Sequence, residues 1–222
     1  MTQPPEKPPT GPTSGVPQAV VSRLSLYLRE LQHLVRDGFD TTSSTQLGKR
    51  LGFSDAQVRK DLAYFGQFGY PGIGYRCEEL ITEVKRILGT NRTWPVAMVG
   101  VGNLGRALLG YKGFGQKGFE VVAAFDVDES KVGREFEGIR VYHFDDLPTM
   151  VGGKGIRFAI LAVPSVAAQT VADQLIAAGI DGILNFAPVT VTVPSNVSII
   201  GVDLAIELEQ LSFAVVNRGY NS

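Results

Sequence analysis

The sequence predicts an α/β protein with a winged-helix domain, a Rossmann-like doubly wound parallel sheet and a C-terminal helix that is swapped between subunits. Three observations predict this. Two serine capping patterns precede short helices, a glycine-rich turn joins a strand to a helix, and the last helix is apolar on several sides. The expected segments are a tail (1–17), a winged-helix domain (18–90), a Rossmann domain (91–202) and a terminal dimerisation helix with its tail (203–222).

The composition indicates a folded, cytoplasmic protein. Of its 222 residues 44% are apolar, and no apolar run approaches the roughly 18 residues that a membrane span needs. Residues 1–17 hold six of the twelve prolines, so this segment is expected to be disordered. The single cysteine, Cys77, excludes an internal disulfide, and two distant histidines make a metal site unexpected.

The first domain has the pattern of a helix-turn-helix. Apolar residues at three- and four-residue spacing predict a first helix between residues 18 and 38. The capping patterns Ser43-x-x-Gln46 and Ser54-x-x-Gln57 each open a short helix. Only Gly52-Phe53 separates these two helices, so the third helix is expected to enter the major groove of DNA.

The outward side of this third helix carries polar side chains. Gln57, Lys60 and Tyr64 share one face, which suits base edges and phosphates; a plain solvated helix face is the alternative. Between Pro17 and Cys77 eight lysines and arginines stand against five acids, a charge of +3 in a chain of net charge −1. This asymmetry favours contact with nucleic acid.

A wing follows the third helix. Residues 66–75 alternate aromatic and turn residues and are expected to form a short β-hairpin. A linking helix at 78–88 then leads to the second domain. The residues predicted to contact DNA are Ser43, Ser44, Gln57, Arg59, Lys60, Tyr64 and Tyr70.

The glycine-rich turn at 100–105 has the pattern of a phosphate cradle. An apolar strand ends at Gly100, which allows a tight turn; Gly102 lets the backbone approach a pyrophosphate, and Gly105 lets the helix pack against the strand. Asp126 ends the next strand, 21 residues after Gly105, where a carboxylate accepts hydrogen bonds from a ribose diol. A glycine-rich turn without a ligand is the alternative.

Other ligand-binding loops are expected at the carboxyl ends of the later strands, because ligands of parallel sheets bind there. Asp126 favours a free ribose, and no arginine follows it to bind a 2′-phosphate, so NAD(H) is preferred over NADP(H). The predicted cofactor-binding residues are Gly100, Val101, Gly102, Asn103, Leu104, Gly105, Asp126, Val127, Val163, Pro164, Asn185, Phe186 and Ala187.

The last helix, predicted over residues 203–216, is apolar on more than one side. Leu204, Leu208 and Leu211 form one row, and Ile206 and Phe213 lie off it. We expect it to insert into a partner subunit; packing against its own sheet is the alternative.

Several motifs together resemble one protein family. They are Ser22-Arg23-Leu24, Tyr27-Leu28-Arg29, Gln57-Val58-Arg59-Lys60-Asp61-Leu62 with Phe65-Gly66, Gly72-x-Gly74-Tyr75, the glycine turn at 99–105, and Gly182-Ile183-Leu184-Asn185-Phe186-Ala187-Pro188. In this combination they are similar to the redox-sensing transcriptional repressor Rex family. The resemblance covers residues 16–216.

The resemblance implies a homodimeric repressor that binds an inverted-repeat operator, is released by NADH, and binds NAD⁺ in the same pocket. Arg29, Tyr111 and Asp203 match the residues whose hydrogen-bonded contact accompanies the DNA-competent state. The oxidised nicotinamide ring carries one positive charge more than the reduced ring, so Asp203 can sense the difference. The wing tip, Tyr70-Pro71, departs from the basic residue that family members often carry there.

Two other function classes compete with this interpretation. One is an NAD-dependent oxidoreductase with an N-terminal helical appendage, and the other is a coenzyme A binding module. Hydride transfer needs a proton donor, and His143 is the only histidine of the second domain, without an evident carboxylate or Tyr-Lys partner. The sequence therefore favours a non-enzymatic protein.

Overall fold

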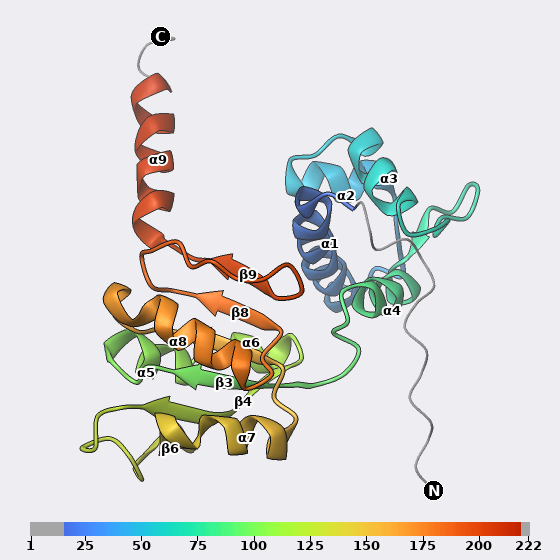
Figure 1. Cartoon of the computed structure of the whole chain (residues 1–222). Helices are drawn as coiled ribbons and strands as arrows, with labels where there is room; N and C mark the ends of the chain where they lie inside the picture. The colour runs from blue at the N-terminus through green and yellow to red at the C-terminus, as the bar shows by residue number, and fades with distance from the viewer. Residues whose placement is uncertain (1–15, 219–222) are drawn as a thin grey trace, which may run out of the picture. The chain divides into compact units, whose positions relative to one another are not determined.

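The computed structural model describes residues 16–218 of the chain (Figure 1). The predicted disordered tail lies outside the described residues, apart from its last two positions. The chain separates into two compact units between Arg92 and Thr93, and each unit is described by itself. The predicted α/β fold class is confirmed, with helices in the first unit and a parallel sheet in the second.

The first unit is a bundle of four helices around one apolar core. Its helices are α1 (Gln18–Arg36), α2 (Ser44–Leu51), α3 (Asp55–Ala63) and α4 (Cys77–Ile87). Each helix is too short or too polar to be stable alone, so burial of its apolar side supplies most of its stability. The core is formed by Leu24, Tyr27, Leu28, Leu31, Leu34, Leu47, Val58, Leu62, Tyr75, Cys77, Leu80 and Val84.

The two predicted capping boxes differ in the structure. The first is confirmed, since the Gln46 amide donates to Ser43 Oγ and the Ser43 amide donates to Gln46 Oε1. In the second, Ser54 Oγ accepts from the Gln57 amide, but the Gln57 side chain turns toward Asp61 instead. The hydrogen bond from Gln57 Nε2 to the Asp61 carboxylate is charge-assisted, and so it is stronger than the neutral bond that Gln57 Oε1 would accept from the Ser54 amide. The predicted reciprocal bond is therefore absent from α3.

The wing is smaller than the predicted hairpin. Within residues 66–75 the structure has one isolated bridge, between Tyr70 and Gly74. The strand that follows, β2 (Tyr75–Arg76), pairs antiparallel with β1 (Thr41–Thr42), which lies before α2. Four glycines in ten residues leave few side chains that could stabilise a longer ladder, so the predicted short hairpin is limited to this one antiparallel bridge.

The second unit is built on a seven-stranded sheet in the order β5-β6-β4-β3-β7-β8-β9 (Figure 1). Only β5 is antiparallel to its neighbour. The first strand, β3, lies in the middle, and the chain winds first to one side and then to the other. This is the doubly wound strand order of dinucleotide-binding domains, with the switch point between β3 and β7. The strands are β3 (Trp94–Val99), β4 (Phe119–Asp126), β5 (Glu135–Phe136), β6 (Ile139–His143), β7 (Phe158–Leu161), β8 (Gly182–Asn185) and β9 (Ser198–Gly201).

Helices cover both faces of this sheet. In β3, Ala97 and Val99 belong to one core cluster with side chains of α7 (Leu147–Lys154) and α8 (Ser165–Ala177). Val96 and Met98 alternate with them and belong to the opposite cluster, together with side chains of α5 (Asn103–Leu109) and α6 (Gly113–Gln116). Both faces of β3 are buried, which accounts for its continuous apolar sequence. α5 ends at Leu109, and the chain continues into the separate turn of α6.

The last helix, α9 (Leu204–Arg218), starts one residue later than predicted. All of its described residues are exposed in the single chain, including Leu208, Leu211 and Phe213. The alternative, in which it packs against its own sheet, is therefore wrong for this chain taken alone. In the part of the chain that the structure describes, no helix is long and apolar enough to cross a membrane.

Two wing glycines allow a matched test of this geometry. Gly74 has φ +90°, and a Cβ there would overlap the Thr42 carbonyl oxygen; Gly72 has φ +75° with nothing within 4 Å. We expect Gly72→Ala to lower the free energy of unfolding of the first unit by about 1–2 kcal/mol, the usual cost of left-handed backbone. Gly74→Ala should cost roughly 2–4 kcal/mol, since the carbonyl must also move. Hydrogen exchange of α1–α4 peptides measures both, and equal losses would contradict the close approach.

Candidate functional sites

A buried carboxylate, Asp61, joins the predicted recognition helix α3 to α1. Arg23 donates from Nε to Asp61 Oδ2 at 2.6 Å and from Nη2 to Oδ1 at 2.8 Å. The Tyr27 hydroxyl donates to Oδ2 at 2.7 Å, and Gln57 Nε2 donates to Oδ1 at 2.7 Å. Two hydrogen bonds thus reach each oxygen of a side chain that is 0% exposed.

These contacts also decide the charge of Asp61. Burial by itself raises the pKa of Asp61, but the hydrogen bonds from Arg23, Tyr27 and Gln57 outweigh it and hold this pKa below its usual value. Burial and the bond to Asp61 raise the pKa of Tyr27, so its hydroxyl remains a donor. Asp61 is therefore ionised at neutral pH. No local sequence pattern indicates this network, because 38 residues separate Arg23 from Asp61.

The predicted DNA-contacting residues of α2 and α3 lie in different environments. Lys60 and Tyr64 are exposed, as expected for a contacting face. Arg59 Nη1 donates to Asp55 Oδ2 at 2.7 Å and to Ser44 Oγ at 3.1 Å, so Arg59 joins the start of α3 to α2. Ser43 is used as the cap of α2. Gln57 does not project freely as predicted, since its amide is bonded to Asp61.

Tyr70 lies back against α4. Its hydroxyl donates to Glu79 Oε2 at 3.1 Å, and the Arg76 guanidinium lies 5.1 Å from the centre of its ring. Arg76 Nη1 also donates to Glu79 Oε1 at 3.0 Å. These contacts hold the wing to the first turn of α4, and contact between Tyr70 and DNA stays a prediction.

The glycine turn is shaped by close backbone approaches at the switch point of the sheet. Gly100 has φ +91°, and a Cβ there would overlap the Ala162 carbonyl oxygen after β7. A Cβ at Gly105 would overlap the Gly100 carbonyl oxygen. Gly102 has no atom within 4 Å of its Cβ position, so the turn is open on the side where a phosphate would approach. A side chain therefore does not fit at Gly100 or Gly105, where two backbone segments approach closely, whereas the position at Gly102 is open.

Asp126 braces this turn. Its Oδ2 accepts the Val101 amide at 2.7 Å and Lys131 Nζ at 3.1 Å, and its Oδ1 accepts the Asp128 amide at 2.9 Å. Burial raises the pKa of Asp126, but the two amides and Lys131 lower it overall, so the carboxylate is ionised. About one acceptor position then remains for a ribose hydroxyl. The predicted ribose contact remains a prediction, beside a structural role that the sequence analysis missed.

Lys131 contacts Asp126 but is not among the predicted cofactor-binding residues. Its Nζ lies 3.1 Å from Asp126 Oδ2 and 3.4 Å from Asp128 Oδ2. The spacing of Lys131 from Asp128, three residues along a turn, is the only local signal for this contact. Its ammonium partly neutralises the two carboxylates that flank the predicted ribose position.

The remaining loops place the other predicted residues near this edge. Val163 and Pro164 follow β7, and the Ala162 amide donates to the Val99 carbonyl at 2.8 Å, so this loop lies beside the glycine turn. The Phe186 amide donates to the Leu161 carbonyl at 2.8 Å. Asn103, Leu104 and Val127 are exposed; Asn103 Oδ1 accepts from Arg106 Nη2 at 2.9 Å.

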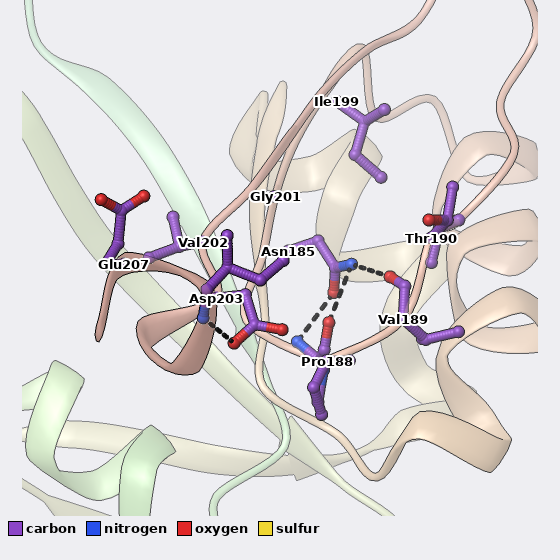
Figure 2. A pocket seen from close by; sticks show the side chains of 12 residues that line it. Asn185, Pro188, Val189, Thr190, Ile199, Gly201, Val202, Asp203 and Glu207 are labelled. Atoms are coloured by element: carbon purple, nitrogen blue, oxygen red, sulfur yellow. Dashed lines mark hydrogen bonds between the residues drawn. The ribbon is translucent and has the colours of Figure 1, made fainter. Parts of the chain in front are cut away.

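A cavity of about 420 Å³ lies between the loop after β8 and the start of α9 (Figure 2). It brings together three predicted residues, Asn185, Ala187 and Asp203. Asn185 Nδ2 donates to the Val189 carbonyl at 2.9 Å, and Asn185 Oδ1 accepts the Ala187 amide at 2.9 Å (Figure 2). The amide of Asn185 therefore holds the loop in shape.

Asp203 lines this cavity from the position just before α9. Its Oδ1 accepts the Ala205 amide at 2.9 Å, so Asp203 caps the helix. Two further polar residues, Thr190 and Glu207, line the same cavity and were missed from sequence. Glu207 could have been found, since it follows Asp203 by four residues and so shares its side of the helix.

The other two predicted switch residues are Tyr111 in the second unit and Arg29 in the first. The Tyr111 ring is exposed and packs edge-on against Phe114 with centroids 5.0 Å apart. A Cβ at Gly113 would overlap this ring, so Gly113 makes room for it. Arg29 is exposed on α1 in the first unit. Its contact with Tyr111 or Asp203 stays a prediction.

Among residues 16–218 no group of three or more His, Cys, Asp or Glu side chains gathers in a way that could hold a metal ion.

Comparison with known proteins decides the family. The redox-sensing transcriptional repressor Rex of Thermus thermophilus is 50% identical over 202 residues, which cover 91% of this chain and 95% of that relative. This chain belongs to the Rex family. The resemblance inferred from the sequence motifs is thereby confirmed.

Solved Rex structures match the whole architecture. The crystal structure of RSP in complex with β-NAD⁺ and operator DNA has a TM-score of 0.88 and 33% identity, covering 94% of this chain and 96% of RSP. RSP in complex with β-NADH has a TM-score of 0.84 and 31% identity, covering 94% and 98%. RSP is described as a Rex-family repressor.

Two family models match parts of the chain. One described as "Putative DNA-binding protein N-terminus" matches residues 15–63, and one described as "CoA binding domain" matches residues 91–189. The second description covers the sheet domain alone, whereas Rex relatives cover both units. Rex membership therefore takes precedence over the coenzyme A alternative. It also disfavours the oxidoreductase alternative, because the relatives are named transcriptional repressors.

Proposed function

We propose that this protein is a cytoplasmic, homodimeric repressor that binds an inverted-repeat operator and is released from it by NADH, without a metal or a catalytic reaction. The observation that carries the proposal is the combination, in a Rex-family chain, of a helix-turn-helix unit with a glycine turn at the switch point of a doubly wound sheet. The RSP complexes with β-NAD⁺ and operator DNA and with β-NADH support both ligands.

The first unit supplies the DNA-binding surface. α3 is held rigidly by Asp61, and Lys60 and Tyr64 are exposed on it. Arg59 and Ser44 meet where α3 begins, so Arg59 reaches a phosphate from a fixed position. Together with the positive charge of this segment, these features suit a helix in the major groove.

The second unit supplies the dinucleotide site. The open space at Gly102 fits a pyrophosphate, and the ionised Asp126 keeps one acceptor position for a ribose hydroxyl. Asp128 adds a second carboxylate nearby, with Lys131 as the one cation bonded to both. A 2′-phosphate would meet two negative charges there, which favours NAD(H) over NADP(H).

The terminal helix supplies the dimer contact. A helix with exposed apolar side chains on more than one side is unfavourable in water, and burial in a second copy removes this cost. The exposed apolar residues of α9 are Leu204, Ile206, Leu208, Leu211, Phe213, Val215 and Val216. A symmetric pair can exchange such helices at low cost in new contacts.

The redox signal is read by charge. NAD⁺ has a positive nicotinamide ring and NADH a neutral one, so a carboxylate near the ring interacts differently with each. Asp203 lies in a cavity at the ligand edge of the sheet, and we propose that it exchanges between the ligand and a contact with Tyr111 and Arg29. The ligands shift the dimer only by their differential affinity for its two states.

A titration tests this function. NADH should weaken binding of the protein to a selected inverted-repeat duplex by roughly 5- to 150-fold, the usual range of coupling between sites, while NAD⁺ should not. Fluorescence anisotropy of labelled duplex measures this.

Arg59→Ala and Lys60→Ala should each weaken DNA binding by about tenfold and leave NADH affinity unchanged. A wild-type affinity for the duplex that does not change when NADH is added would reject the sensor function.

The sensing charge can be tested without removing the helix cap. Asp203→Asn keeps a capping oxygen for α9 but removes the charge. It should bind both NADH and DNA, with NADH changing DNA affinity less than about threefold, far below the usual coupling range. Glu207→Gln, which neutralises the other carboxylate of the cavity, should respond like the wild type. The reverse result would assign the sensing role to Glu207.

The glycine turn predicts opposite outcomes for two alanine variants. Gly102→Ala should fold normally, since its Cβ position is open, but should weaken NADH binding by about tenfold or more. Gly105→Ala should destabilise the second unit, because its Cβ would overlap the Gly100 carbonyl. Calorimetric titration and thermal unfolding separate the two effects. Unchanged NADH affinity in Gly102→Ala would place the pyrophosphate elsewhere.

A further inference from the structure

The network around Asp61 includes one residue of the predicted base-contacting face, Gln57. An ionised carboxylate has acceptor positions only, and each oxygen of Asp61 already accepts two hydrogen bonds. The side-chain amide of Gln57 must therefore present Nε2, and not Oε1, to Asp61. The ionised state of Asp61 removes the ambiguity between the two ends of this amide.

The other edge of the Gln57 amide remains for DNA. Once one N–H of Nε2 is donated to Asp61, the carbonyl Oε1 and the second N–H, which lies on the same edge as Oε1, are left. Gln57 lies in the first turns of α3 and is partly exposed. The N-terminal residues of a recognition helix are those that reach base edges.

This pair of groups matches one base. In the major groove adenine offers the N7 acceptor and the N6 donor, which pair with the N–H and Oε1 of a glutamine. Guanine offers two acceptors, N7 and O6, and the second would face Oε1 unfavourably. A glutamine free to rotate could instead present both N–H groups to guanine. The contact with Asp61 withholds one of them.

We propose that Asp61 is a positioning residue for base recognition: by holding Gln57 Nε2, it sets the orientation of this amide and selects adenine at one position of each operator half-site. The proposal rests on the DNA-binding function proposed above. Asp61 acts through Gln57, and Arg23 and Tyr27 keep Asp61 ionised and fixed in turn. Its buried side chain does not touch the DNA.

The test compares base preferences. A duplex is first selected from a randomised library with the wild-type protein, and the affinities for all single-base variants of one half-site are measured by anisotropy. The wild type should prefer adenine at one position by about tenfold or more. Gln57→Ala and Asp61→Asn should each lower this preference to about threefold or less, with other positions unchanged. The double variant should lose nothing further, because both changes remove the same contact.

Tyr27→Phe is the matched control, since it removes one bond to Asp61 but leaves the one from Gln57. It should lower stability and keep the adenine preference. A uniform loss of affinity in Asp61→Asn with the preference intact, or an equal loss of preference in Tyr27→Phe, would overturn the proposal and reduce Asp61 to a structural role. Failure of the wild type to select any sequence would instead reject the DNA-binding function itself.

A second measurement uses the wild-type chain, in case Asp61→Asn does not fold. The side-chain amide of Gln57, assigned by its absence from the spectrum of Gln57→Ala, should show one shifted proton that exchanges more slowly than those of the exposed Gln67. Two protons that behave like those of Gln67 would overturn the proposal.

Discussion

A buried carboxylate needs hydrogen-bond donors around it, and this constraint shapes both functional units. In the first unit Asp61 receives four hydrogen bonds, and the three that come from Arg23 and Tyr27 hold α3 on α1. In the second, Asp126 receives the Val101 amide and so fixes the glycine turn to the end of β4. In each case the carboxylate is ionised although burial opposes it. The parts that face the ligands are therefore held by hydrogen bonds within the protein itself.

The doubly wound sheet explains why the dinucleotide site forms where it does. At the switch point, the loops after β3 and β7 lead to helices on opposite faces of the sheet, and their backbones approach each other closely. Gly100 and Gly105 permit this close approach, while Gly102 remains open. The cavity at Asp203 lies further along the same edge, beyond β8 and β9. The tightly packed glycine turn thus lies at one end of this edge, and the cavity lined by Asp203 and Glu207 lies at the other.

The terminal helix and the switch residues depend on a second copy in the proposed function. α9 buries none of its described residues within its own chain, so its apolar sequence is explained by what it contacts in a dimer. Asp203 contributes both to the terminal helix and to the cavity, because it caps α9 and also lines the cavity. A change in the charge next to Asp203 can therefore act directly on the helix that is proposed to join the subunits. This arrangement suits a sensor, in which a modest change in binding energy has to shift a dimer between two states.

Local sequence alone determined the helices α1 to α4 and α9, the strands β3 and β4, the Ser43 capping box and the three glycines of the turn. These features depend on residues close together in the chain, through apolar periodicity, capping and backbone freedom. Only the tertiary structure decided the partners of the functional side chains. Asp61 meets Arg23 across 38 residues, and Asp126 meets the Val101 amide across 25. No local pattern indicates such contacts, because they depend on which faces of the folded elements come together; for this reason Gln57 was expected to point freely outward, and the structure instead holds it by its amide nitrogen.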